Sequence, residues 1–252
     1  MERANFVAFA CGKRGSGKSF LLDRLSEKFP RRIIIDPLGE YLGRYEGAQE
    51  CGSLTETLDA LEVNIYNGGV RRWTVVSCIE PNDTGQLCGA LAPVGNMAGG
   101  YSRAVGGVCL VCGEVDTIAP NSAAIPSAVR NVLQRGRHYR VSFLGGTQRP
   151  RDVHRVVTSQ ADALFIFRQH ELRDLDYIAR ITSGPLAQVV RELPIYTHAR
   201  YLPNTGDCAI IDKNGRATRR VNVFDGSSDI QSDLPLLADD TDNETDNAES
   251  DN

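Results

Sequence analysis

The sequence lacks the features of membrane-spanning and exported proteins. None of its apolar runs approaches the roughly 20 residues needed to span a bilayer, and the N-terminus has no basic segment followed by an apolar one. The seven cysteines are odd in number and lie mostly in apolar runs, so we interpret them as reduced, buried thiols. With 252 residues, of which 41 % are hydrophobic, the chain can bury a substantial core. We therefore expect a soluble intracellular protein built on one α/β domain.

The sequence also lacks a complete metal-ligand or catalytic-triad pattern. Cys109 and Cys112 form a C-x-x-C pair, but no second pair or histidine cluster completes a zinc site. A strand also directs residues three apart to opposite faces. The four histidines have no spacing suited to a metal or a triad, so we expect solvated or hydrogen-bonding roles for His138, His154, His170 and His198.

Lysine is scarce, and charge is unevenly distributed along the chain. Only four of the 28 basic residues are lysine, a bias that we attribute to genome composition. Residues 1–220 hold all 28 basic and 22 of the 32 acidic residues, a net charge of +6, whereas residues 221–252 carry −10. We predict one domain over residues 1–224 and a disordered acidic tail over 225–252, because the tail has too few apolar residues to offset ordering entropy. The tail either solubilises the protein or competes with nucleic acid for the basic body.

What the sequence does have is a phosphate-binding loop. A glycine, four residues, then glycine, lysine and serine is the spacing of a P-loop, in which Lys18 reaches the β- and γ-phosphates and Ser19 ligates Mg²⁺. The glycines permit positive φ angles and close approach to the phosphates. A predicted strand at 5–11 and a predicted helix at 19–29 flank the loop in the required order. We therefore predict ATP and Mg²⁺ as ligands of Gly12, Lys13, Arg14, Gly15, Ser16, Gly17, Lys18 and Ser19.

Strands and helices alternate along the rest of the body. This alternation predicts an α/β fold with a central, mostly parallel sheet flanked by helices on both faces. The C-terminal region predicts a β-hairpin, because Asn214-Gly215 lies between two short strands. The predicted strands are 32–36, 72–78, 108–112, 140–145, 163–167, 208–211 and 217–223, and the predicted helices are 53–63, 86–91, 123–135 and 172–181.

Glu114 is the candidate catalytic carboxylate. It follows the apolar strand 108–112, where a carboxylate beside the γ-phosphate would polarise the attacking water; alternatively it only caps the strand. The residue before such a carboxylate usually helps to hold Mg²⁺, but here it is Gly113. Either Asp116 substitutes for the missing aspartate, or Ser19 and ordered waters hold the metal without it.

Gln148 is the second catalytic candidate. It lies in Gly146-Thr147-Gln148-Arg149-Pro150, just past the strand 140–145. An amide at the tip of a strand adjacent to the P-loop can donate to the γ-phosphate or to the attacking water. An ordinary turn explains the same residues when they are taken alone.

Taken together, these motifs resemble the HerA–FtsK superfamily of DNA-pumping ATPases. The resemblance covers about residues 5–181 and rests on GKRGSGKS, IIIDPLGEY, Glu114, GRHYRVSFLGGTQRP and ADALFIFRQHELRDLDYI, in that order. The small size resembles the genome-packaging ATPases of tailless icosahedral viruses with an internal membrane. The resemblance implies a RecA-like core, a homo-oligomeric and typically hexameric ring with ATP sites between subunits, and double-stranded DNA in the pore. It also implies a place in the host cytoplasm or at a virion vertex, with capsid-vertex or internal-membrane proteins as partners.

The resemblance also implies an arginine that reaches the ATP of a neighbouring subunit. Family position favours Arg137, with Arg135, Arg140 and Arg149 as competitors. For sequence-independent DNA contacts, the candidates are the pair Arg71-Arg72 and the glycine-rich loop 95–107 with Tyr101 and Arg103. Each is equally well explained as a surface segment without a DNA role.

The leading functional prediction is an ATP-driven double-stranded DNA translocase that packages a viral genome. One alternative is a cellular or plasmid DNA pump of the same superfamily. A second is a small P-loop kinase in which residues 130–140 form an arginine-rich lid. A third is a switch that binds ATP without hydrolysing it, which the glycine at position 113 makes conceivable.

Overall fold

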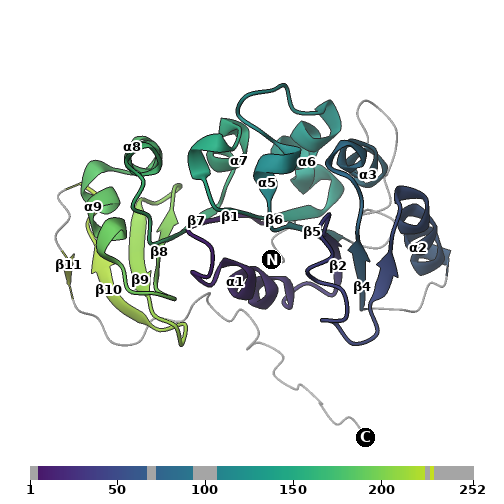
Figure 1. Ribbon diagram of the computed structural model, residues 1–252, viewed down its shortest axis with the longest axis horizontal. Helices are drawn as coiled ribbons and strands as arrows, with labels where there is room; N and C mark the ends of the chain where they lie inside the picture. The colour runs from purple at the N-terminus through teal and green to yellow at the C-terminus, as the bar shows by residue number, and fades with distance from the viewer. Residues whose placement is uncertain (1–4, 67–71, 93–106, 225–227, 230–252) are drawn as a thin grey trace, which may run out of the picture.

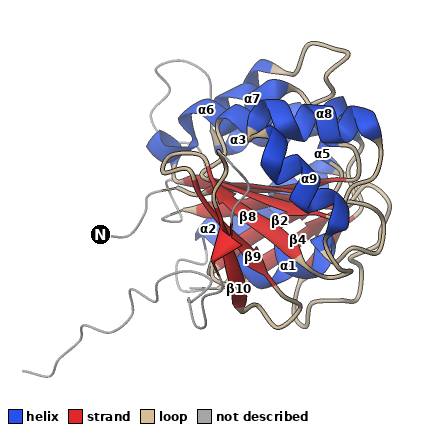
Figure 2. Ribbon diagram, turned by 90° about the vertical axis from the view of Figure 1, so that its left-hand side faces the viewer, coloured by secondary structure: helices blue, strands red, loops and turns tan. Residues whose placement is uncertain are grey.

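The computed structural model describes residues 5–66, 72–92, 107–224 and 228–229. They form one twisted sheet of eleven strands with helices on both faces, which confirms the predicted α/β architecture (Figures 1 and 2). No helix within these described ranges is both long and apolar enough to cross a membrane.

The sheet has a parallel part and an antiparallel part. Its strand order is β11-β10-β9-β8-β7-β1-β6-β5-β2-β4-β3, in which the pairs from β7 to β3 are parallel and those from β7 to β11 are antiparallel. The parallel strands are β1 (Val7–Cys11), β2 (Arg31–Ile35), β3 (Gln49–Cys51), β4 (Trp73–Ser77), β5 (Val108–Cys112), β6 (Val141–Thr147) and β7 (Ala163–Phe167). The remaining strands are β8 (His198–Leu202), β9 (Asp207–Ile211), β10 (Ala217–Val221) and β11 (Ser228–Asp229).

The helices are distributed unevenly over the two faces. Among the described helices, α1 (Lys18–Ser26) packs on one face of the sheet. On the other face gather α3 (Thr84–Leu91), α6 (Ser127–Tyr139), α7 (Arg155–Ser159) and α8 (Leu172–Ile181) (Figure 2). The central strands are buried on both faces, which is why they are continuous apolar runs in the sequence. The remaining described helices are α2 (Leu54–Tyr66), α5 (Val115–Ile118) and α9 (Gly184–Glu192), with short 3₁₀ turns η1 (Pro81–Asp83) and η2 (Pro150–Asp152).

Several element boundaries differ from those predicted. Strands 108–112 and 163–167 and helix 172–181 are confirmed to the residue. The helix predicted at 123–135 instead begins at Ser127, directly after Pro126, and continues to Tyr139, where Arg140 ends it with a φ of 56°. Helix α9 and strand β8 were not predicted.

The C-terminal hairpin is confirmed as β9 and β10. The connection between the two strands comprises residues 212–216 and is therefore longer than a two-residue Asn-Gly turn. Within it, Asp212 Oδ1 accepts hydrogen bonds from the backbone N–H groups of Asn214 (2.9 Å) and Arg216 (2.8 Å). Two residues of the predicted acidic tail, Ser228–Asp229, pair with β10 as β11, and the rest of 225–252 lies outside the described residues.

Candidate active site

The P-loop connects the end of β1 to the start of α1, as predicted. Gly15 and Gly17 adopt φ angles of 74° and 104°, which only glycine reaches without strain. Gly12 is needed for another reason, which corrects the prediction that all three glycines supply positive φ. Its φ is not in that region, but an added Cβ would lie 2.5 Å from Phe167 Cβ and 2.9 Å from Ser16 Oγ.

Lys18 is buried inside the loop. Only 8 % of its surface is exposed, and its Nζ donates to the backbone oxygens of Gly12 (2.7 Å) and Lys13 (3.0 Å). Burial lowers the pKa of Lys18, and the negative charge of Glu114 partly opposes this effect. The ammonium is thus held by weak acceptors that a phosphate can replace, within electrostatic reach of the candidate catalytic carboxylate.

The loop also fits an anionic, metal-bound ligand. Ser16 Oγ is buried without a hydrogen-bond partner among the described residues, an arrangement that a phosphate oxygen would relieve. Ser19, in the first turn of α1, is exposed at the helix N-terminus, where the helix dipole favours an anion. This arrangement is compatible with the predicted binding of ATP by the loop and of Mg²⁺ by Ser19, and both assignments stay predictions.

Glu114 and Gln148 lie together at the tips of neighbouring strands. Glu114 follows β5 and Gln148 follows β6, which separates β5 from the P-loop strand β1. Gln148 Nε2 donates to Glu114 Oε1 at 3.3 Å. Burial raises the pKa of Glu114; the hydrogen bond from Gln148 lowers it, and the negative charge of Asp116 raises it further. The structure thus brings together the predicted carboxylate, the predicted amide and Lys18.

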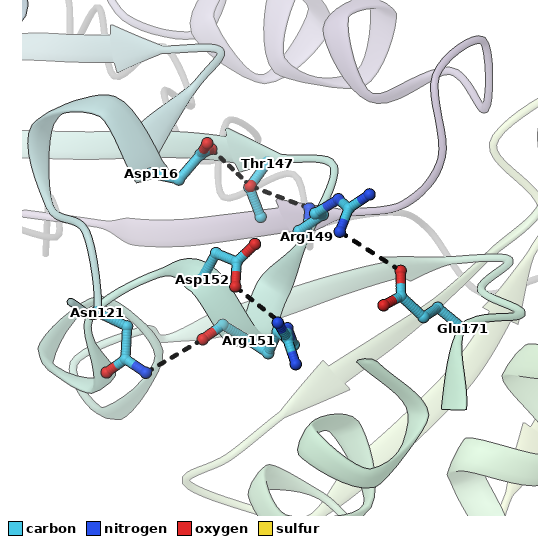
Figure 3. A network of polar contacts seen from close by, with 7 residues as sticks. All are labelled: Asp116, Asn121, Thr147, Arg149, Arg151, Asp152 and Glu171. Atoms are coloured by element: carbon cyan, nitrogen blue, oxygen red, sulfur yellow. Dashed lines mark hydrogen bonds and ion pairs between the residues drawn. The ribbon is translucent and has the colours of Figure 1, made fainter. Parts of the chain in front are cut away.

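Asp116 has a partner other than a metal in this structure. Thr147 Oγ1 donates to Asp116 Oδ1 at 2.7 Å and accepts from the backbone N–H of Arg149 at 3.2 Å (Figure 3). The described residues contain no group of three or more His, Cys, Asp or Glu side chains suited to a metal. The observed contact gives Asp116 a role in fixing the tip of β6, and its role as a metal ligand stays a prediction.

The strand tip that carries Gln148 is fixed from a second side. Gln169, only 2 % exposed, donates its Nε2 to the backbone oxygen of Gln148 at 3.1 Å. Arg149 points away from Thr147 toward Glu171, with 3.6 Å between Nη1 and Oε2 (Figure 3). Because both partners are exposed, this ion pair contributes little to stability.

Arg137 lies far from the P-loop of its own chain. It is exposed in the last turn of α6, and β6 then runs seven residues, about 20 Å at 3.3 Å per residue, to the edge that carries Gln148. Arg135 and Arg140 share the distant edge, whereas Arg149 lies at the P-loop edge. A contact between Arg137 and the ATP of its own subunit is incompatible with this arrangement, and its role in a neighbouring site stays a prediction.

A cavity that sequence reasoning missed opens beside the P-loop. Its volume is about 600 Å³, and it lies between α1, the end of β7 and the hairpin loop at 212–215. Phe20 and Tyr196 line it with 62 % and 55 % of their surfaces exposed, and Tyr196 adopts a left-handed φ of 63°. An added Cβ on Gly17 would lie 3.3 Å from Tyr196 Cδ1, so this ring packs on the P-loop. A cavity of this size and aromatic character suits a nucleoside.

His198, which also lines this cavity, departs from the expected solvated or hydrogen-bonded role. It is 4 % exposed, and its Nε2 has no hydrogen-bond partner in the described part of the chain. Burial lowers its pKa to about 4, so the imidazole is neutral near pH 7. A ring centroid distance of 4.9 Å places it against Phe167.

Cys109 and Cys112 pack into the cores on opposite faces of the sheet, as the strand geometry predicts.

Most of the candidate DNA-contacting residues, Arg71 and residues 95–106, lie outside the described residues. Arg72 is exposed and donates to the backbone oxygen of Glu27 at 3.1 Å.

The fold and the site define a class of protein. A parallel order of β7-β1-β6-β5-β2, with the P-loop after β1 and an acidic residue after β5, is the RecA-like arrangement of P-loop NTPases. Neither a protein-family model nor a curated protein matches the sequence.

Solved structures give the particular likeness. The fold matches that of the genome packaging NTPase B204 from Sulfolobus turreted icosahedral virus 2 in complex with ATP-gammaS, with a TM-score of 0.65 and 22 % identity over 82 % of this chain and 96 % of that one. The B204 structure described as the DNA-packaging ATPase of Sulfolobus turreted icosahedral virus matches with a TM-score of 0.62 and 22 % identity over 83 % and 98 %. VirB4 of Thermoanaerobacter pseudethanolicus matches with a TM-score of 0.53 and 14 % identity over 84 % and 90 %.

Proposed function

We propose that this protein is an ATPase that moves double-stranded DNA and packages a viral genome into a preformed capsid. The observation that carries the proposal is the contact between Glu114 and Gln148 beside Lys18, because it joins hydrolytic and sensing groups at one phosphate site. The likeness to B204 supports the packaging role, since B204 is a genome packaging NTPase of similar length and fold.

In this proposal the P-loop binds the phosphates of ATP. Lys18 would exchange its two carbonyl acceptors for phosphate oxygens, and the Ser19 hydroxyl would ligate Mg²⁺. Mg²⁺ supplies charge neutralisation at the phosphates when it is bound. The base enters the cavity lined by Phe20 and Tyr196, where an aromatic stack is available.

The residues at the ends of β5 and β6 then carry out hydrolysis. The Glu114 carboxylate orients and polarises the attacking water, and the Gln148 amide, which already points at Glu114, donates to that water or to the γ-phosphate. Buried Gln169 and Thr147 contact the tip of β6 that carries Gln148, so a displacement of Gln148 by the γ-phosphate would change these contacts.

The proposal includes a ring of identical subunits around double-stranded DNA, with six as the expected number. Arg137, distant from its own P-loop, would then neutralise charge at the site of a neighbour. Such a ring acts in the host cytoplasm or at a virion vertex, where capsid-vertex or internal-membrane proteins are the partners.

The test is ATP hydrolysis by purified protein with and without double-stranded DNA across a salt series. DNA should stimulate hydrolysis for any sequence, and the DNA affinity should fall by about 10³-fold or more between about 50 and 200 mM salt if six to ten phosphates are contacted. The Lys18→Ala variant, prepared identically, controls for contaminating ATPases. Hydrolysis that ignores DNA at every salt concentration would exclude a translocase.

A DNA pump of a cell or plasmid is the second candidate function. A gene for a major capsid protein beside the gene for this chain would support packaging instead. The kinase alternative is weakened, because residues 130–139 belong to α6, whose Val132 and Leu133 are buried in the core and cannot open as a lid.

A further inference from the structure

The space beside Gly113 is occupied by the phenol of Tyr41. An added Cβ on Gly113 would lie 3.4 Å from Tyr41 Oη and 3.9 Å from its Cε2, both ordinary contact distances. The φ of Gly113 is not in the left-handed region, so the backbone does not require glycine here. The side chain that would normally extend from this position toward the metal is therefore replaced in space by a tyrosine from another segment.

Tyr41 is buried with its polar atom unsatisfied. Its exposed fraction is 5 %, and no residue in the described ranges completes a well-formed hydrogen bond to its Oη. Burial raises the pKa of Tyr41, whereas a hydrogen-bonding contact with the Ser19 side chain, too poorly aligned to satisfy Oη, lowers it, so the phenol lies beside the candidate Mg²⁺ ligand. A buried hydroxyl whose only polar neighbour is this poorly aligned Ser19 contact keeps hydrogen-bonding capacity that a polar ligand can satisfy.

The fold holds Tyr41 firmly in this place. After β2, the carboxylate of Asp36 accepts hydrogen bonds from the backbone N–H groups of Glu40 (2.9 Å) and Tyr41 (2.7 Å), and Asp36 itself is 3 % exposed. The Arg44 guanidinium lies 4.7 Å from the centre of the Tyr41 ring, and the ring of Tyr45 stacks parallel to it at 6.4 Å. These contacts fix both the backbone and the ring, so Oη has a defined position between Ser19 and Gly113.

We propose that Tyr41 takes the place of the missing aspartate and that its hydroxyl hydrogen-bonds a water of the hydrated Mg²⁺ held by Ser19 and the ATP phosphates. This inference rests on the proposed nucleotide site. A phenol suits the task because its oxygen accepts from water while its O–H donates to a second oxygen. It also adds no negative charge next to Glu114, whose pKa is raised by burial and further by the charges of Asp116 and Glu40.

The test is the affinity for ATP, measured calorimetrically once with Mg²⁺ and once with EDTA. The ratio of the two affinities gives the contribution of Mg²⁺ to ATP binding. In Tyr41→Phe, which keeps the ring and its stacking, the affinity with Mg²⁺ should fall by about tenfold and the affinity with EDTA should not change. Tyr45→Phe is the matched control: it removes the hydroxyl of the stacked neighbouring ring, which donates to Asp23 at 2.5 Å. It should leave the ratio unchanged. A wild-type ratio in Tyr41→Phe would overturn the proposal.

A second variant tests the exchange of one group for the other. Adding Gly113→Asp to Tyr41→Phe should restore the gain in ATP affinity from Mg²⁺, since the new carboxylate supplies an oxygen acceptor from the position next to the lost hydroxyl. A double variant no better than Tyr41→Phe would contradict the proposal. Wild-type protein that binds no Mg-ATP would refute the nucleotide site itself, which separates failure of the proposed function from failure of the role of Tyr41.

Discussion

Replacing Glu114 with Gln should stop ATP hydrolysis and leave the folded state slightly more stable. Burial raises the pKa of this carboxyl above its ordinary value of 4.5, and the charges of Asp116 and Glu40 act in the same direction. Ionisation of Glu114 therefore costs free energy in the folded protein. The protonated carboxyl contributes its full stability to the fold below about pH 4.5, and this contribution is lost as pH rises through the raised pKa. At neutral pH, Glu114→Gln should have a slightly higher free energy of unfolding than the wild type, and the difference should disappear at acidic pH.

The effect on the rate should be much larger. A group that positions or deprotonates the attacking water contributes about 10²–10⁴-fold, or roughly 3–5 kcal/mol of barrier. The glutamine oxygen can still accept from Gln148, so the 3.3 Å contact and the strand tips should survive. The ATP affinity should be equal or higher, because one negative charge leaves the phosphate site. In the wild type, the rate should rise with pH through the raised pKa of Glu114.

Three measurements check this prediction: thermal unfolding at acidic and neutral pH, calorimetric ATP binding, and single-turnover hydrolysis. Glu171→Gln is the matched control, since Glu171 is an exposed carboxylate near the same edge that pairs with Arg149. It should change none of the three. Wild-type hydrolysis by Glu114→Gln would refute the catalytic role, and a rate loss accompanied by a large stability loss would show that Glu114 is structural.

Three further variants test the other parts of the site. Lys18→Ala should abolish calorimetric ATP binding, because the buried ammonium is lost; undiminished binding would remove the P-loop assignment. Arg137→Ala should lose turnover but keep ATP binding, and mixing it with Glu114→Gln subunits should restore some activity; no recovery would exclude action on a neighbour. Phe20→Ala should weaken ATP by about tenfold through lost base stacking without weakening tripolyphosphate; an equal loss for both would place the base elsewhere.

The parts of the fold that sequence predicts well are local. The P-loop depends on consecutive residues, and β5 and β7 are continuous apolar runs because both of their faces are covered. Helix α9 carried a usable signal as well, since Ser183 caps it by accepting from the backbone N–H of Leu186 at 3.2 Å and a proline occupies the first turn.

The end of β6 shows why some boundaries escape sequence reasoning. Gly145 and Gly146 suggest that the strand stops, yet both lie inside it. An added Cβ on Gly145 would lie 2.6 Å from Val115 Cγ2, and one on Gly146 would lie 3.0 Å from Leu22 Cδ1. These glycines allow close packing of α5 and α1 on the sheet, a requirement set by residues distant in sequence.

The contacts within the site are likewise non-local. Glu114 and Gln148 were both candidates, but their contact depends on β5 and β6 being neighbours, which no local pattern specifies. The role of Tyr41 and the cavity beside Phe20 and Tyr196 depend on loops that meet only in the folded chain.

The parallel and antiparallel parts of the sheet contribute to different parts of the candidate site. The parallel strands β5 and β6 end at Glu114 and Gln148, on one side of the P-loop, whereas the antiparallel hairpin reaches the cavity on the other side through its loop at 212–215. Lys18 lies between them because β1 separates β6 from β7. Changes in the hairpin loop should therefore alter which nucleotide binds and how tightly, while changes at the tips of β5 and β6 should alter the rate of hydrolysis of a nucleotide that is already bound.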